Sequence, residues 1–262
     1  MILYIPYKMK IPNLKKVTNF TIIITLSVLG ILLVISASQK NSSKRCKGIE
    51  IKIKDNANQI LITKSDVEKW ITNYGNEPFE GKIIENIDLS TVEKRVLNKG
   101  FAKKCEAFTN LQGYLVVEIE GFIPIARILG ENGFSDRFLD KEGTIFPFSR
   151  HFSPNVTILS GSYFNNLKSL KTNKNQDLLS LILKISNDEF WEAQIAQINV
   201  DNQKEIQMIP LMGNNIIEFG RPEHIEGKLN KLLIFYKQIL PQKQWEAFSK
   251  ISVKYDGQIV CN

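Results

Sequence analysis

The pattern of apolar and polar positions separates one long apolar stretch near the start of the chain from a folded remainder. Between Lys16 and Lys40, 23 consecutive residues carry no charge. At ~1.5 Å per residue, a helix of this length crosses a ~30 Å hydrocarbon core. We therefore expect a cytoplasmic tail over 1–16, a transmembrane helix over 17–39 and a linker over 40–45. The apolar side chains expected in the membrane are Phe20, Ile22, Leu26, Leu29, Leu32 and Ile35.

A cleaved signal peptide is the alternative for the same stretch. It would have a basic start, an apolar core over 22–35 and small residues at 36–38. The length of the uncharged segment favours the retained anchor, and the pattern leaves the alternative open.

The next 75 or so residues predict the order strand, helix, helix, strand, strand. Residues 49–54 alternate apolar and charged side chains, which is typical of a half-buried strand. Thr63, followed three residues later by Asp66, predicts a capped helix start, and Asp88 predicts a second one. Two further strands are expected over 101–108 and 114–122.

After Pro124 the pattern predicts a second mixed domain. Short strands are expected around a turn at Asp140–Gly143, where glycine permits a positive φ. A helix follows in the segment 176–191, with Leu178, Leu181, Ile182 and Ile185 inward. Further strands are expected in 190–200, 205–211 and 214–220, then a helix from Pro222 that ends before Pro241. The last strand begins at Ile251, and Asp256–Gly257 predicts a hairpin turn or a bulge. The predicted class is α+β, with domains over 46–126 and 127–262 and an antiparallel sheet in the second.

The charge distribution argues against nucleic-acid binding. The net charge is +7, but residues 1–48 hold eight basic and no acidic residues, which leaves 26 of the 34 basic residues against 27 acidic ones. The folded part therefore lacks the basic surface that a phosphate backbone requires.

The sequence gives no constellation typical of an enzyme, a metal site or a cofactor site. Cys46, Cys105 and Cys261 lack the spacing of zinc ligands. They are expected to be small buried side chains, with a Cys46–Cys105 bridge as an open alternative. His151 lies in an expected loop and His224 in a first helical turn, and Ser160-Gly161-Ser162 lacks the spacing of a nucleophile elbow. We expect a protein without catalytic activity.

Five features in order resemble the bacterial cell-division family FtsQ/DivIB. A single span precedes a strand-helix-helix-strand-strand module that is similar to the family's POTRA domain. "GYLVVEIEGFIPIARI" resembles the family's strand that ends in proline and arginine, here Pro124 and Arg127, and these two residues are expected at the domain junction. "FLDKEGTIFP" resembles the turn that opens the family's β domain. "NNIIEFGR" and "ISVKYDGQIVC" resemble the step into the last helix and the last strand.

The resemblance implies a non-catalytic bitopic scaffold of the inner membrane, with its C-terminal domain in the periplasm at the division septum. In the family, the last strand receives a segment of FtsB, itself paired with FtsL, by strand addition. Upstream division proteins are expected to contact the POTRA-like part. Carried over to this chain, the receiving residues are Ser252, Val253, Lys254, Tyr255, Asp256, Gly257, Gln258 and Ile259, with Arg221 and Lys228 for an acidic residue of the partner.

Less specific interpretations remain at this point. Tyr255 could instead lie in the core, and Arg221 could be solvated at a helix start. An anchored cell-envelope enzyme or an outer-membrane assembly module are the alternative functions.

Overall fold

The computed structural model describes residues 24–32, 44–54, 61–130, 133–149, 151–243 and 247–262. Residues 24–32 are helical, and Leu26, Leu29 and Leu32 are exposed on them, whereas Phe20, Ile22 and Ile35 lie outside the described residues. Within the described ranges, no helix combines the length and the hydropathy needed to cross a bilayer.

The first module has the strand-helix-helix-strand-strand order that the sequence predicts. Its elements are β1 (Ile49–Lys54), α2 (Lys64–Ile71), a 3₁₀ turn (Ile84–Asn86), α3 (Leu89–Leu97), β2 (Ala102–Thr109) and β3 (Leu115–Gly121). The sheet order is β1-β3-β2, with β1 parallel and β2 antiparallel to β3. Both helices contribute buried side chains to the module's core, among them Val67, Ile71, Val92 and Val96.

Both predicted helix caps are confirmed. The Thr63 hydroxyl accepts the N–H of Asp66 at 3.2 Å, and the Asp66 carboxylate accepts the N–H of Thr63 at 3.0 Å. The Asp88 carboxylate accepts the N–H of Thr91 at 3.1 Å. These reciprocal bonds satisfy backbone donors that a helix start otherwise leaves unpaired.

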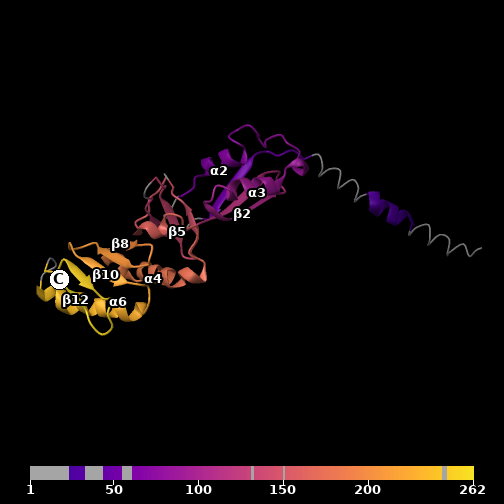
Figure 1. The fold of residues 1–262 in the computed structure, drawn as a ribbon. Coiled ribbons are helices and arrows are strands. Elements are labelled where there is room, and N and C mark those ends of the chain that lie inside the picture. The colour runs from indigo at the N-terminus through magenta and orange to yellow at the C-terminus, as the bar shows by residue number, and fades with distance from the viewer. Residues whose placement is uncertain (1–23, 33–43, 55–60, 131–132, 150, 244–246) are drawn as a thin grey trace, which may run out of the picture.

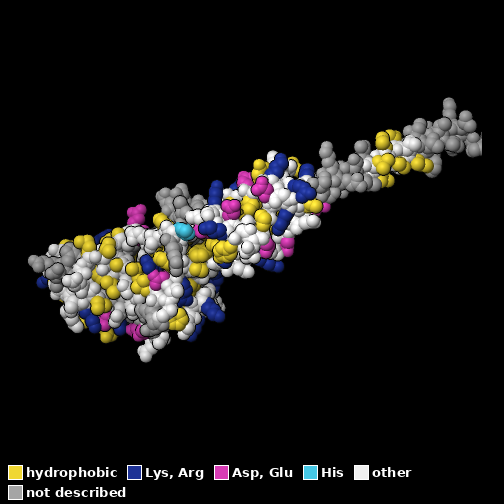
Figure 2. All heavy atoms as spheres, turned by 90° about the horizontal axis from the view of Figure 1, so that it is seen from above, with side chains coloured by type: hydrophobic (Ala, Val, Ile, Leu, Met, Phe, Trp, Pro, Cys, Tyr) yellow, Lys and Arg dark blue, Asp and Glu magenta, His cyan; other side chains and the backbone are white. Residues whose placement is uncertain are grey.

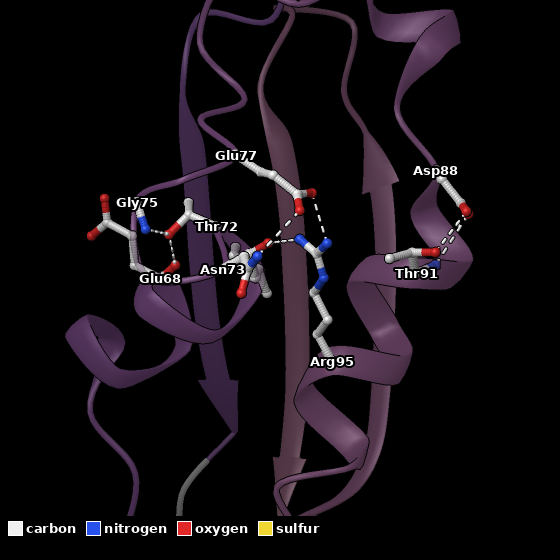
Figure 3. A network of polar contacts seen from close by, with 9 residues as sticks. Glu68, Thr72, Asn73, Gly75, Glu77, Asp88, Thr91 and Arg95 are labelled. Atoms are coloured by element: carbon white, nitrogen blue, oxygen red, sulfur yellow. Dashed lines mark hydrogen bonds and ion pairs between the residues drawn. The ribbon is translucent and has the colours of Figure 1, made fainter.

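Arg95 of α3 binds the end of α2 (Figure 3). Its guanidinium donates to the Ile71 carbonyl at 2.6 Å and to the Glu77 carboxylate at 2.7 Å. Ile71 is the last residue of α2, so this carbonyl has no partner within the helix. The chain then runs through positive φ at Asn73, Tyr74 and Gly75. The arginine therefore fixes the point where α2 turns towards α3.

Replacing Arg95 by methionine is expected to lower the free energy of unfolding by about 1.5–3 kcal/mol, the usual worth of a hydrogen bond to a charged donor. Methionine keeps an unbranched apolar stem but leaves the Ile71 carbonyl without this donor. Chemical denaturation measures the change. Glu77→Gln is the matched control and should cost less, because it leaves the Ile71 bond in place. Equal stability of Arg95→Met and the parent protein would contradict this role.

The second module is a nine-stranded mixed sheet with helices. Its strands are β4 (Pro124–Ile128), β5 (Arg137–Asp140), β6 (Ile145–Pro147), β7 (Thr157–Ser160), β8 (Ile195–Val200), β9 (Ile206–Pro210), β10 (Ile216–Gly220), β11 (Lys250–Ser252) and β12 (Val260–Cys261). The helical elements are 3₁₀ turns at Ser162–Phe164 and Asn173–Asn175, α4 (Gln176–Ser186), α5 (Glu189–Gln194), α6 (Ile225–Ile234), a π-helical turn (Phe235–Ile239) and α7 (Leu240–Lys243). The sheet order is β12-β11-β10-β9-β8-β7-β4-β5-β6.

Several expectations for this module need correction. The sheet is mixed rather than antiparallel, because β4/β7, β7/β8 and β10/β11 are parallel pairs. Residues 190–194 are helical, since the Asp188 carboxylate caps α5 by accepting the N–H groups of Phe190 and Trp191. The last long helix begins at Ile225, not Pro222, and continues past Pro241 after the π-helical turn. The helix predicted in the segment that runs to Trp191 is confirmed over Gln176–Ser186, with the inward side chains expected for it.

The two modules meet at the β5–β6 hairpin, whose predicted turn is confirmed. The Gly143 N–H donates to the Asp140 carbonyl at 3.0 Å, and Gly143 has φ +81°. Phe138 and Phe146 of this hairpin are buried in the core of the first module, and Phe146 stacks on Phe122 with centroids 5.0 Å apart. The next residue, Leu139, belongs to the core of the second module. Neighbouring residues of β5 therefore enter two different cores.

Polar contacts add to this junction. The buried Ser149 hydroxyl donates to the Leu61 carbonyl at 2.7 Å, and His151 Nε2 lies 2.9 Å from the Asp66 carboxylate. Arg127 binds Asp136 through Nε at 3.0 Å, and its guanidinium lies 4.5 Å from the centre of the Phe148 ring. The two modules lie end to end, with the C-terminus at the end far from the first module (Figure 1).

Candidate partner-docking edge

The end of the chain forms a short hairpin at one end of the nine-stranded sheet. β11 lies inside the sheet, parallel to β10 on one side and antiparallel to β12 on the other. The expected receiving residues 252–259 therefore do not form one exposed edge strand, and Ser252 and Val253 are buried. The strand ends at Ser252, and 253–259 connect it to β12 through the predicted turn at Asp256–Gly257, where Gly257 has φ +70°.

The pairing of β12 identifies which of its backbone groups face outward. The Asn262 N–H donates to the Lys250 carbonyl at 3.1 Å, and the Lys250 N–H donates back at 3.3 Å. In an antiparallel pair, bonded positions alternate with positions whose N–H and C=O point to the other side. Ser252 and Val260 form the next bonded pair, so the N–H and C=O of Cys261 point away from β11. Ile259 precedes β12 and packs against the core of the second module, so the outward backbone groups of this strand are those of Cys261.

Three other sheet edges have residues that hinder the addition of a further strand. β6, at the opposite end of the nine-stranded sheet, contains Pro147, which has no N–H to donate. On β2, the Ala107 N–H donates to the Glu93 carboxylate of α3 at 2.8 Å. β1 carries Lys52 and Lys54, both near Glu118 of β3. Among the edges that the structure describes, β12 has neither a proline nor a side-chain cap of these kinds.

The side chains near this edge differ in how accessible they are. Tyr255 is 54% exposed and Val260 is 40% exposed, so the core interpretation of Tyr255 is wrong. The Arg221 side chain is exposed on the segment before α6, with Nε 3.8 Å from the Glu205 carboxylate. Lys254 binds the same carboxylate at 3.0 Å. Arg221 therefore lies beside an acidic group of its own chain and still presents guanidinium donors to solvent.

Lys228 does not lie where the sequence places it. The side chain is buried, its ammonium donates to the Arg221 carbonyl at 2.8 Å, and it lies 4.9 Å from the centre of the Phe219 ring. Burial lowers the pKa of this ammonium. The expectation that Lys228 is displayed for an acidic partner is corrected, because the helix turns the side chain towards its own fold.

Sequence reasoning missed Val260 and Cys261, the two residues of the edge strand itself. It placed the receiving edge at 252–259, although a hairpin turn at Asp256–Gly257 followed by the apolar residues 259–261 could have identified a second, shorter strand. Local patterns do not show which of two hairpin strands lies outermost, because that depends on pairing with β10.

The described residues do not form a group of three or more His, Cys, Asp or Glu side chains placed to hold a metal ion. His224 is the residue before α6 and has a left-handed backbone. All three cysteines are free, so the alternative Cys46–Cys105 bridge does not form. Burial raises the pKa of the Cys105 thiol to about 11, which keeps it protonated and unreactive at neutral pH.

The surface charge is mixed rather than basic. On the face shown in Figure 2, lysine and arginine side chains alternate with aspartate and glutamate over both modules. An edge that offers backbone groups on such a surface suits a protein strand rather than a polyanion.

Two family models match the chain and together cover both modules. The model "FtsQ/DivIB, C-terminal related" matches residues 123–262, and the model "POTRA-like domain" matches residues 44–120. No match was found among the curated proteins. FtsQ/DivIB is a family of generally non-catalytic cell-division proteins, as the resemblance of the sequence implies. With more than half of its length matched by the C-terminal model, this chain belongs to the FtsQ/DivIB family.

Proposed function

We propose that this protein is a bitopic inner-membrane scaffold of the bacterial division machinery, which recruits FtsB- and FtsL-like proteins at the septum by strand addition. The observation that carries the proposal is the outward-facing backbone of β12, at the one end of the large sheet that lacks a proline or side-chain cap. Family membership supports the cell-division context.

Strand addition would complete the hydrogen bonds of Cys261 with backbone groups of the partner. Because side chains alternate along a strand, successive partner residues would lie on the two faces of the extended sheet, one of them beside the exposed Val260. Tyr255 offers a large amphipathic side chain next to this edge, and Arg221 offers donors for a partner carboxylate.

The apolar segment 17–39 supplies the proposed anchor, with its N-terminus in the cytoplasm and the two modules in the periplasm. Confinement to the membrane plane raises the effective concentration of other anchored proteins, so a short edge would suffice for recruitment. The POTRA-like module would provide a separate contact with upstream division proteins.

Co-purification from membranes tests the proposal. A C-terminally tagged protein should be extracted at the mass of the uncleaved chain, together with FtsB- and FtsL-like proteins, and should concentrate at the septum. A soluble protein of reduced mass would show that the apolar segment is a cleaved signal. An uncleaved protein without division partners would contradict the scaffold.

Tyr255→Glu is expected to reduce partner retention at least about tenfold, because it removes aromatic contact area and places a charge in the proposed interface. The exposed position predicts little change in folding. Leu111→Glu, at an 89% exposed residue of the first module, is the control for a new surface charge and should bind normally. Quantitative pull-down checks both variants, and wild-type retention by Tyr255→Glu would remove this residue from the interface.

A further inference from the structure

Three backbone carbonyls of the β11–β12 connection converge on one ammonium group. Lys231 of α6 places Nζ 3.3 Å from the Val253 carbonyl oxygen and 3.4 Å from that of Gln258. The same ammonium also donates to the Tyr255 carbonyl. A lysine ammonium carries three N–H donors and no acceptor, so its whole capacity is directed at this one connection.

The connection needs an external support because the hairpin it belongs to is very short. β11 and β12 share two paired positions, Ile251 with Cys261 and Ser252 with Val260. Among the strands that the structure describes, β11 is the one that pairs with β12. Residues 253–259 lie between the two strands without belonging to either, so the position of β12 depends on what holds this segment.

Two lysines of α6 bind backbone carbonyls, one in the segment before the helix and the other in the β11–β12 connection after it. Lys228 binds the Arg221 carbonyl, just before the helix, and Lys231 lies one turn further along the same helix. The first lysine fixes the entry to α6, whereas the second fixes the segment that leads to the outermost strand. The Lys231 contact joins the connection before the proposed docking strand to α6, and the Val253 N–H joins the same connection to the Glu218 carbonyl of β10 at 3.0 Å.

We propose that Lys231 is a positioning residue for the β12 edge: it holds the carbonyls of Val253, Tyr255 and Gln258 on α6 and thereby fixes the position of the outward N–H and C=O of Cys261. The role of β12 as a docking strand rests on the function proposed above. The Lys231 ammonium already binds three carbonyls of the β11–β12 connection. Its contribution to partner binding is therefore indirect, through the position of β12.

Hydrogen exchange of the full-length chain in detergent tests the positioning itself. In Lys231→Met, which keeps the apolar stem, amides over 250–262 are expected to exchange at least about tenfold faster, while those of α3 are unchanged. Lys231→Arg should give an intermediate rate, because a planar guanidinium does not reproduce three converging donors. Lys237→Met is the matched control, an exposed lysine of the following turn whose Nζ lies 5.9 Å from the centre of the Phe190 ring. Unchanged exchange in Lys231→Met would overturn the proposal.

Retention of FtsB- and FtsL-like proteins, measured on the same variants in membranes, tests the consequence. Lys231→Met is expected to lose at least about tenfold in partner affinity, and Lys237→Met to bind normally. Faster exchange with unchanged affinity would overturn the link between the connection and the edge. Failure of the wild-type chain to bind such partners would contradict the proposed function, while the exchange rates would still decide whether Lys231 holds β12.

Discussion

Replacing Phe138 by alanine is expected to lower the free energy of unfolding by about 3–5 kcal/mol, the usual cost of removing a fully buried phenylalanine side chain. The ring is completely inaccessible and lies between Phe146 and Phe148, with centroids 5.6 and 5.2 Å away. Phe138 is therefore completely buried at the point where the two modules meet.

The same substitution should also uncouple the two modules. Phe138 belongs to β5 of the large sheet, yet its ring packs in the core of the first module, while Leu139 beside it packs in the second. Loss of the ring removes a side chain by which a strand of the large sheet packs into the core of the first module. We expect one cooperative unfolding transition in the parent protein and two separated transitions in Phe138→Ala.

Calorimetry and chemical denaturation check both parts of this expectation. Phe134→Ala is the control, because Phe134 is 44% exposed and its removal should cost far less. A loss below about 1 kcal/mol in Phe138→Ala, or a single unchanged transition, would contradict the role of β5 in joining the two cores.

The first module was predictable because its signals are local. The capping pairs at Thr63 and Asp88 and the alternation along 49–54 each lie within a few residues of the element that they define. The turn at Asp140–Gly143 was predictable for the same reason, since one carboxylate and one glycine specify it.

The arrangement of the second module depends on contacts between distant residues. β10 pairs with β11 through Ile217 and Ile251, which lie on either side of α6, and no local pattern carries that information. Asp188 caps α5, whose residues overlap the start of the strand expected over 190–200. The inward turn of Lys228 likewise follows from the position of Arg221 and Phe219 in three dimensions.

Cys261→Pro is expected to reduce partner affinity by about ten- to 100-fold with the fold intact. Proline removes the outward N–H of the edge and brings its ring into the path of an added strand. The N–H at this position is not used by β11, and the preceding Val260 is already extended, as a residue before proline prefers. Affinity is measured with the purified full-length chain and the FtsB- and FtsL-like pair.

Cys261→Ala is the matched control, because it removes the thiol but keeps the N–H. Binding should remain close to that of the parent protein. Equal loss in both variants would assign the effect to the side chain rather than to the backbone edge, and equal retention in both would place the partner elsewhere.

The most direct measurement is residue-resolved hydrogen exchange of the chain with and without the bound FtsB- and FtsL-like partner. Strand addition at β12 requires the outward amide of Cys261 to be slowed at least about tenfold in the complex, with little change at the already bonded Val260 and Asn262. A bound partner that leaves the amide of Cys261 exchanging at its free rate would contradict the account.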